Sequence, residues 1–457
     1  MRRWSTDGAA RHLIGGTTQR PGIDGAARRW PIAAVFAFLV VAAVMPRAGN
    51  AEPAAAPARS FSRAGFDRIG DYLRNEIATG KIPGAVLLIQ QHGAPIYSES
   101  FGMRNVATNT PMTPDSIFRI YSMSKAITSV AAMMLVDDGK LSLTDPVSKY
   151  IPAFADVKVG VDISDETGQR PLKLDPLKRP ITIEDLLRHT SGLTYGFFGE
   201  TQVRKLYAHS GLYDGDFDNA EFVQRLVELP LADQPGTRWD YGHSTDVLGR
   251  VVEVVSGQTL FQFEKQRLLD PLVMPDTAFF VADAAKRPLI AQPLPRDAFD
   301  PDHPIAGIKD PALPHRWESG GAGMVGTIGD YARFLQMLLN GGTLDGRRYL
   351  KPETVARMTS DDIGPETGII HDPFYFPGVT SGFGLGFAVR TVVPPNTSWP
   401  LGEYRWNGAA GTFYFVDPKD DMFVVCMLQA PTQGSRIELE LKGLIYDALG
   451  RGLRAQQ

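Results

Sequence analysis

The sequence predicts an α/β (α+β) fold in which one antiparallel sheet, flanked by helices, carries an inserted, mainly helical lobe. Three observations lead to this prediction. Strand patterns gather towards both ends of the chain, helical patterns fill the middle, and short turns join neighbouring strands. We therefore expect one domain over residues 61–457, with a sheet lobe at about 61–145 and 320–457 and a helical lobe at about 146–319, separated by a cleft.

The first strands follow an amphipathic helix. The residues that recur at helical spacing are Phe66, Ile69, Leu73 and Ile77, and Gly80 is expected to end the helix. Residues 85–90 and 95–101 are typical of two strands, and His92-Gly93 between them predicts a hairpin. A helix rich in Ala, Met and Val is predicted from Ser122 to Asp138, before Gly139.

Helical patterns dominate the middle of the chain. Residues 157–180 carry many charges and prolines, which indicates a long surface excursion. Thr182-x-x-Asp185 is a capping box and predicts a helix that ends near His189. Further helices are expected at 221–229, 244–255 and 260–269. Strand patterns are nearly absent from Asp145 to Pro314.

Strand patterns return in the last part of the chain. A helix that Thr327 begins and Gly341 ends comes first. The elements expected after it are strands at 383–390, 411–416 and 422–428, a turn at 417–420 and a helix at 437–449. Cys426, the one cysteine, lies in an expected strand, so we expect a buried core residue and no intrachain disulfide.

The composition argues against several classes of protein. The net charge is −4 and no basic block occurs, which argues against a nucleic-acid partner. The eight histidines are scattered and no Cys-x-x-Cys occurs, so we expect no metal site and no cofactor. Gly321, Gly323 and Gly326 match Gly-x-Gly-x-x-Gly, but no strand precedes them. A glycine turn before a helix is therefore expected rather than a dinucleotide site.

The first 51 residues have the pattern of an export signal. The apolar stretch Ile32–Met45 has 14 residues, Arg28 and Arg29 precede it, and Gly49-Asn50-Ala51 is a suitable cleavage site. The stretch is short for a membrane span, although a retained anchor is the alternative. We expect residues 1–51 to be a signal peptide, 52–60 a linker, and the mature protein periplasmic or secreted. Removing seven arginines and two aspartates gives the mature chain a charge of −9.

Ser122-Met123-Ser124-Lys125 is the only Ser-x-x-Lys in the chain. In a helix that begins at Ser122, the serine and Lys125 lie one turn apart on the same face. A serine hydroxyl needs an adjacent base to become a nucleophile, and a lysine can be that base when burial favours its uncharged amine. A helix start also offers backbone N–H groups to a developing oxyanion. The alternative is a capping serine followed by a surface lysine.

Further motifs follow this pair in a fixed order. The five stretches are Phe118–Lys125, Leu187–Leu193, Tyr241-Gly242-His243, Ser319–Gly323 and Trp406-Asn407-Gly408. Together they resemble the β-lactamase-like serine hydrolases, which include class C β-lactamases, D-alanyl-D-alanine peptidases and family VIII carboxylesterases. The resemblance runs over residues 66–449 and implies the β-lactamase/transpeptidase-like fold.

The resemblance also implies catalytic roles. Ser122 would attack the acyl carbonyl and Lys125 would take its proton. Tyr241 would complete the base and later protonate the leaving group. The backbone N–H groups of Ser122 and Ala409 would form the oxyanion hole, and water would release the acyl group.

Two departures from the family pattern concern substrate binding. Penicillin-binding members usually carry Lys-Thr-Gly or a similar basic triplet where this chain has Trp406, Asn407 and Gly408. A tryptophan offers an apolar wall and one indole donor, and it cannot hold a carboxylate as a cation does. His243 stands where β-lactamases place an asparagine that binds the substrate amide. The tryptophan triplet is similar to that of the family VIII carboxylesterases.

These observations predict a serine hydrolase that cleaves small carboxylic esters through an acyl-enzyme on Ser122. Its expected partner is a small-molecule ester, and we expect it to contact the membrane only transiently, through the signal peptide. A β-lactamase or D-alanyl-D-alanine carboxypeptidase on the same site is the first alternative. A non-catalytic envelope-binding protein is the second, and the intact set of Ser122, Lys125 and Tyr241 argues against it.

The export signal leads to the first testable prediction. The mature protein is expected to begin at or near Glu52, because signal cleavage follows small residues such as Ala51. N-terminal sequencing of protein from a periplasmic fraction checks this. A cytoplasmic product that retains residues 32–45 would show that the apolar stretch is not a signal.

Overall fold

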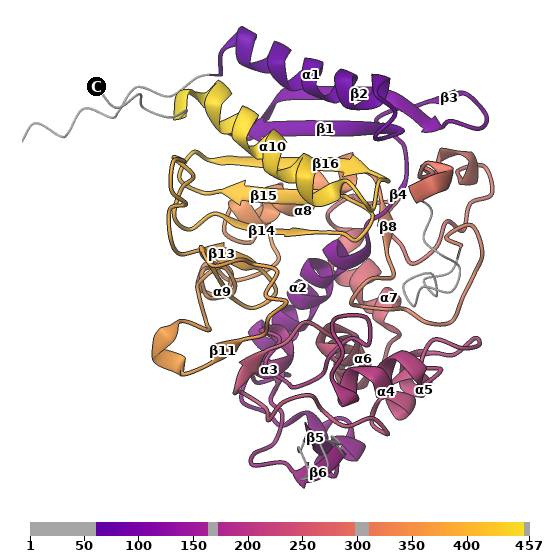
Figure 1. The fold of residues 1–457 in the computed structure, drawn as a ribbon, viewed down its shortest axis with the longest axis vertical. Coiled ribbons are helices and arrows are strands. Elements are labelled where there is room, and N and C mark those ends of the chain that lie inside the picture. Colours follow the sequence, from indigo (N-terminus) through magenta and orange to yellow (C-terminus); the bar gives the residue numbers. More distant parts are fainter. Residues whose placement is uncertain (1–60, 163–171, 298–309, 452–457) are drawn as a thin grey trace, which may run out of the picture. The chain divides into compact units, whose positions relative to one another are not determined.

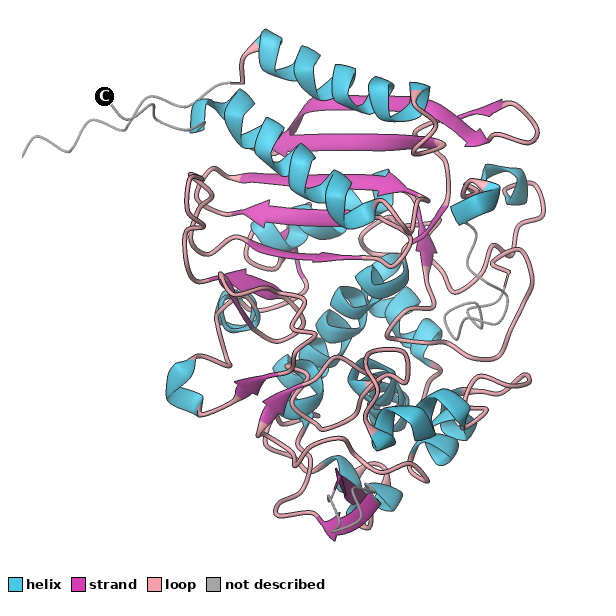
Figure 2. Ribbon diagram, viewed as in Figure 1, coloured by secondary structure: helices cyan, strands magenta, loops and turns pink. Residues whose placement is uncertain are grey.

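The computed structural model describes residues 61–162, 172–297 and 310–451, and its centre is one antiparallel sheet. In spatial order the eight strands are β12 (Ser381–Phe383), β13 (Ala388–Arg390), β14 (Tyr404–Asn407), β15 (Phe413–Asp417), β16 (Met422–Leu428), β1 (Gly84–Gln91), β2 (Ala94–Asn105) and β3 (Thr110–Pro111). The pairing of β16 with β1 joins strands from the two ends of the chain in one sheet (Figures 1 and 2). This confirms the predicted fold class.

Local turn chemistry explains the hairpin between β1 and β2. His92 and Gly93 have φ angles of 52° and 74°. Left-handed conformations at both central residues match the right-handed twist of the flanking strands. Between β15 and β16, Asp417 accepts a hydrogen bond from the Lys419 N–H at 3.0 Å, and Asp421 has a φ of 47°. Both predicted turns are therefore present.

Two helices cover one face of the sheet, α1 (Arg63–Ala78) and α10 (Gly434–Tyr446). Leu87 on β1 is paired with Cys426 on β16, and both side chains belong to the apolar cluster that these two helices complete. Side chains alternate between the faces of a strand, so the neighbouring Val86 and Met427 belong to the core on the opposite face. Cys426 is fully buried, as predicted.

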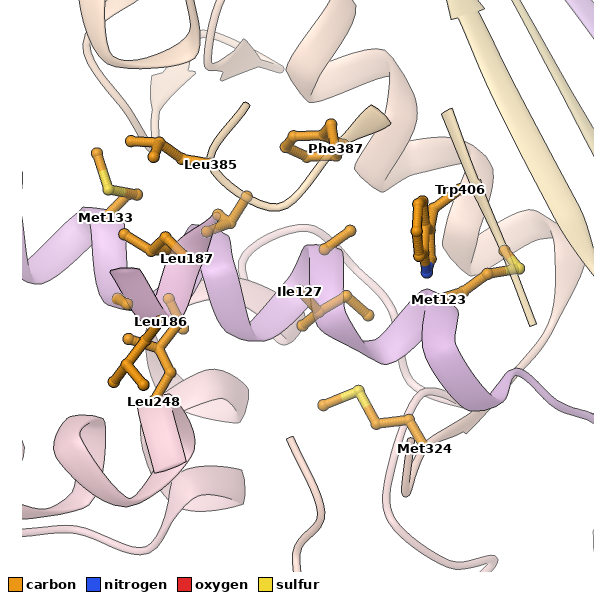
Figure 3. Packing of buried hydrophobic residues seen from close by; sticks show 14 of the residues in the cluster. Met123, Ile127, Met133, Leu186, Leu187, Leu248, Met324, Leu385, Phe387 and Trp406 are labelled. Carbon is orange, nitrogen blue, oxygen red and sulfur yellow. The ribbon is translucent and has the colours of Figure 1, made fainter. Parts of the chain in front are cut away.

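The opposite face packs on α2 (Ser124–Asp137) and α8 (Ile328–Leu339). Helix α2 is buried on all sides from Ser124 to Leu135, which explains its nearly continuous run of small and apolar residues. In Figure 3, Ile127 lies on α2 between Trp406 on the sheet side and Leu248 in the helical block. The helix thus connects the sheet to the helical block through one continuous core.

The remaining α-helices are mostly short. The α-helices are α3 (Ile183–Leu187), α4 (Gln202–His209), α5 (Asn219–Leu226), α6 (Ser244–Ser256), α7 (Leu260–Glu264) and α9 (Pro352–Met358), and a π-helical turn at Lys265–Leu269 continues α7. Short 3₁₀ turns lie at Val147–Lys149, Pro152–Ala155, Arg287–Leu289, Pro295–Asp297 and Pro365–Thr367. The capping box of Thr182 and Asp185 opens α3, and Gly257, with a φ of 72°, ends α6. The capping box was predicted from the sequence.

The predicted surface excursion at 157–180 contains strands instead. Strands β5 (Lys158–Asp162) and β6 (Leu172–Pro176) form an antiparallel hairpin, and the Gly160 N–H donates to the Leu231 carbonyl at 2.8 Å. Apolar and polar residues do alternate in both strands, but each strand has only five residues and lies in a charged, proline-rich stretch. Strand β7 (Arg238–Trp239) likewise pairs with β11 (Ile370–His371), so the helical block is not free of strands.

The predicted strand at 383–390 is two strands separated by a turn. Gly386 has a φ of 102°, a conformation that few residues other than glycine adopt. A Cβ atom at Gly384 would lie 2.2 Å from the Met358 carbonyl oxygen, so the chain passes too close to α9 for any side chain. The backbone therefore bends between β12 and β13.

Two further pairs of two-residue strands occur in the described part of the chain. They are β4 (Phe118–Arg119) with β8 (Val325–Gly326), and β9 (Thr343–Leu344) with β10 (Arg347–Arg348).

The expected signal peptide at 1–51 and linker at 52–60 lie outside the described residues. Within the ranges that the structure describes, no helix combines the length and the apolar character needed to cross a bilayer.

A buried ionic cluster ties α10 to the sheet. The Glu403 side chain is 0% exposed and accepts hydrogen bonds from Arg390, Lys442 and the hydroxyl of Tyr446. Arg405 lies 3.8 Å from the same carboxylate. The negative charge of Glu403 compensates the positive charges of these neighbours, which would otherwise be buried without a counter-ion.

Replacing Glu403 with Gln is therefore expected to lower the free energy of unfolding by about 3–5 kcal/mol, because it leaves the buried cations uncompensated. Urea unfolding measures this change. Glu99→Gln is the matched control, because Glu99 forms an exposed ion pair with Arg74 and should change stability far less. Equal effects of the two substitutions would contradict the assigned role of Glu403.

Candidate active site

Ser122 lies on a 3₁₀ turn at Tyr121–Met123, immediately before α2. The sequence placed Ser122 at the start of the α-helix itself, whereas the helix begins at Ser124. Tyr121 has a φ of 42°, and a non-glycine residue held in this region costs on the order of 1–3 kcal/mol. This strained turn presents Ser122 to the cavity described below.

Lys125 is a buried amine with partners in three parts of the fold. Its side chain is 2% exposed. The Nζ atom donates to the Gly321 carbonyl at 2.7 Å, to the Tyr195 hydroxyl at 3.2 Å and to Ser122 Oγ at 3.3 Å. The predicted contact between Ser122 and Lys125 is therefore present, and Lys125 is not a surface lysine.

Tyr195 was not singled out in the sequence, although it is the tyrosine whose hydroxyl accepts a hydrogen bond from Lys125. Burial raises the pKa of Tyr195 well above its usual value, so the hydroxyl is neutral. The available signal was its place just after Ser191-Gly192-Leu193, a stretch already included in the family motif. Gly192 has a φ of 85°, which marks a backbone turn shortly before Tyr195.

Tyr241 stands just before α6, as predicted, and its side chain is 7% exposed. The Lys125 amine lies over its ring, 4.6 Å from the centroid. The Tyr241 hydroxyl accepts a hydrogen bond from the indole nitrogen of Trp406 at 3.3 Å. A Cβ atom at Gly242 would lie 2.4 Å from the Leu193 carbonyl oxygen, which explains the glycine that follows the tyrosine.

The triplet at the end of β14 has its three residues in different environments. Trp406 is 5% exposed, and Figure 3 shows its indole near Met123 at the start of α2. The Asn407 side chain donates to Glu438 on α10 at 2.9 Å. A Cβ atom at Gly408 would lie 2.4 Å from the Ile120 carbonyl oxygen, so only glycine allows β14 to approach the turn that carries Ser122.

Ala409 follows directly and lines the same cavity as Ser122. The Gly408 N–H donates to the Thr412 carbonyl at 2.7 Å, and the Gly411 N–H donates to the Gly408 carbonyl at 2.9 Å. This tight loop holds Ala409 beside the serine. The structure thus brings together the two residues predicted to supply oxyanion N–H groups.

His243 is 1% exposed and has a partner at each ring nitrogen. Its Nδ1 lies 2.8 Å from Asp246 Oδ2, and its Nε2 lies 3.0 Å from the Tyr213 hydroxyl. Its ring also packs edge-on against Tyr195, with 4.5 Å between the centroids. The residue predicted to bind substrate is therefore part of the cavity wall, with both nitrogens already engaged.

The cavity beside Ser122 has a volume of about 150 Å³ and a mainly aromatic lining. A cavity of this size can hold a group as large as benzene. The lining residues are Tyr121, Ser122, Tyr195, Phe197, Phe198, Tyr213, Tyr241, His243, Asp246, Trp317, Ser319, Ala322, Phe376, Trp406, Asn407 and Ala409. None of these is a lysine or an arginine. Within the described ranges, no cluster of His, Cys, Asp and Glu is arranged to hold a metal ion.

A buried ionic group includes Asp240, the neighbour of Tyr241 in the chain. Asp240 precedes the tyrosine and accepts a hydrogen bond from Arg204 at 2.9 Å, while Arg204 also donates to Asp372 at 3.0 Å. Burial raises the pKa of Asp240 to about 7 against the opposing charge of Arg204, and the carboxylates of Asp372 and Asp233 add to the rise. One arginine is thus shared between two buried carboxylates.

The fold and this site define a serine hydrolase of the β-lactamase type. The Beta-lactamase family model matches residues 69–444, which shows that the chain belongs to the Beta-lactamase family.

Among the relatives of this chain, lovastatin esterase of Penicillium rubens is 32% identical over 376 residues, which cover 78% of this chain and 90% of that protein. Esterase EstB of Burkholderia gladioli is 30% identical over 392 residues, covering 80% and 91%. The solved structure of EstCE1, described as a hydrolase with promiscuous acyltransferase activity, matches 84% of this chain and 99% of its own, with a TM-score of 0.67 and 27% identity.

Asp240 leads to a prediction about pH. Between about pH 4 and 7 the Asp240 carboxyl group loses its proton in the unfolded chain and keeps it in the folded chain. The contribution of Asp240 to stability therefore falls as the pH rises. Asp240→Asn cannot titrate. The free energy of unfolding of the variant, relative to wild type, should therefore increase by roughly 2–4 kcal/mol from pH 4 to pH 7.5.

Urea unfolding of both proteins at several pH values measures this difference. The part of the difference that is the same at every pH reflects the changed hydrogen bonds of the amide, and the part that varies with pH tests the prediction. A difference that does not vary with pH would contradict the raised pKa of Asp240.

Proposed function

We propose that this protein hydrolyses small, neutral carboxylic esters through an acyl-enzyme on Ser122. The observation that carries the proposal is the cavity beside this serine. Its lining is aromatic, it contains no lysine or arginine, and Trp406 stands where penicillin-binding relatives carry a cation. A wall of this kind suits an apolar acyl or alcohol group and gives a carboxylate no charged partner.

The proposed reaction begins with the attack of Ser122 Oγ on the ester carbonyl. Lys125, 3.3 Å from this oxygen, takes the proton. The backbone N–H groups of Ser122 and Ala409 bind the oxyanion. The alcohol leaves with a proton that Tyr241 delivers, and water then attacks the acyl-enzyme by the reverse sequence.

The contact between Trp406 and Tyr241 supports this assignment. The indole N–H donates to the tyrosine hydroxyl, so an oxygen lone pair of Tyr241 is already turned towards the tryptophan. This hydrogen bond holds the phenol in place over the Lys125 amine. Trp406 is therefore proposed both to form the apolar wall and to orient the group that protonates the leaving alcohol.

Two relatives with about one-third sequence identity are named as esterases, which agrees with the proposal. The first alternative, a β-lactamase or a D-alanyl-D-alanine carboxypeptidase, acts on substrates with a carboxylate, and the lining of the cavity offers no cation to bind one. The second alternative, a non-catalytic binding protein, would not need Ser122, Lys125 and Tyr241 to be assembled.

We further propose that the enzyme works in the periplasm or outside the cell, on the basis of the signal pattern at 1–51.

The test exchanges the apolar wall for a cation. Trp406→Lys should lower kcat/KM for p-nitrophenyl butyrate. The same substitution should raise the rate of acylation by a cephalosporin by about 10- to 150-fold, which corresponds to one charged hydrogen bond of roughly 1.5–3 kcal/mol. Wild type should hydrolyse the butyrate ester well and the cephalosporin poorly. Steady-state kinetics on both substrates, together with melting curves, provides the measurement.

Two controls accompany this test. Trp406→Phe keeps an apolar wall and removes only the indole donor, so it should not gain activity on the cephalosporin. Ser122→Ala should abolish ester hydrolysis and leave melting nearly unchanged. A wild type already fast on cephalosporins, or equal losses on both substrates in Trp406→Lys, would contradict the proposal.

A further inference from the structure

We infer that Asp246 is a positioning residue that holds the glycine turn at 319–323 against the Lys125 amine. The inference rests on the proposed function, because it concerns how the base of that reaction is held. Asp246 was not among the residues that the sequence singled out. It lies in the first turn of α6, five residues after Tyr241, and its side chain is almost completely buried.

Both carboxylate oxygens of Asp246 have partners. Oδ1 accepts hydrogen bonds from Ser319 Oγ at 2.6 Å and from the Gly321 N–H at 3.1 Å. Oδ2 lies 2.8 Å from His243 Nδ1. One carboxylate therefore connects the glycine turn to the histidine on the wall of the cavity.

Gly321 transmits this contact to Lys125. Its N–H is held by Asp246, and its carbonyl accepts the shortest of the three Lys125 hydrogen bonds, at 2.7 Å. A Cβ atom at Gly321 would lie only 3.0 Å from Asp246 Oδ2, so the absence of a side chain permits the close approach. The two backbone groups of one residue thus connect the carboxylate to the amine.

The charge of Asp246 strengthens this arrangement. Burial alone would raise the pKa of Asp246, but the hydrogen bond and charge of His243 and the charge of Lys125 hold it below its usual value, so the group is ionised near neutral pH. Its position at a helix N-terminus favours the negative charge further. The other titratable groups in its surroundings are His189, Tyr195 and Tyr213, and burial keeps each of them neutral.

The consequence for the reaction is geometric. A fixed Gly321 carbonyl keeps the amine of Lys125 within reach of Ser122 Oγ, and a displacement of about 1 Å can cost around 100-fold in rate.

Asp246→Asn is the test, because it keeps the shape of the side chain and removes its charge. With p-nitrophenyl butyrate, kcat should fall by about 10- to 100-fold with KM changed less than about threefold. Labelling with a fluorophosphonate should slow in parallel, because it reports attack by Ser122 directly.

Asp330→Asn is the matched control. Asp330 is also a buried carboxylate at the third position of a helix, where it accepts hydrogen bonds from the Asp276 N–H and Thr277. It lies outside the cavity lining, so its replacement should leave kcat and KM nearly unchanged. Ser319→Ala removes one hydrogen bond to Asp246, and it should lower kcat less than Asp246→Asn does.

The outcomes separate this inference from the proposed function. A wild type that does not hydrolyse the ester overturns the proposed function. An active wild type with Asp246→Asn equal to it in kcat and in the rate of fluorophosphonate labelling overturns the positioning role. If Asp246→Asn does not fold, Ser319→Ala decides: a lower kcat with unchanged KM and melting supports the role, and wild-type kinetics overturn it.

Discussion

The hydrogen bonding of the buried Lys125 amine is the interaction on which the rest of the site depends. An amine removed from water must find replacement partners, and those of Lys125 come from the turn before α2, the segment after α3 and the glycine turn before β8. Each acceptor must lie within hydrogen-bond distance, so the three segments must pack together around one atom. The same packing brings Ser122 beside an amine, which is the arrangement that nucleophilic catalysis by serine requires.

The sheet supplies the second half of the site. Because β16 pairs with β1, the strands that lead to Trp406 lie over the beginning of α2, although almost three hundred residues separate them in the chain. Gly408 makes this approach possible, since any side chain there would meet the Ile120 carbonyl. Trp406 in turn contacts Tyr241 from the helical block. The cavity is thus formed where the sheet, α2 and the helical block meet, and its aromatic lining follows from the residues that each contributes.

Much of the fold and site could be predicted because the signals are local. A capping box is a pair of hydrogen bonds within four residues, so Thr182 and Asp185 identified the start of α3. The turn at His92-Gly93 depends on the backbone freedom of two residues. Strands β5 and β6 were missed because each is only five residues long and lies in a charged, proline-rich stretch. The bend between β12 and β13 was missed because its cause is the distant Met358 carbonyl. Tyr195 and Asp246 were missed because each acts through a partner far away in the chain.

By itself the sequence determined the fold class, most of the longer helices and strands, and the candidate set of Ser122, Lys125, Tyr241 and Trp406, since periodicity, turn residues and motif order are properties of the chain alone. Only the tertiary structure decided the partners of these residues: that Lys125 donates to Tyr195 and Gly321, that Asn407 contacts Glu438, and that His243 is held by Asp246 and Tyr213. The physical reason is that a hydrogen bond needs two groups within about 3 Å, and the distance between groups far apart in the chain is set by the packing of the whole core.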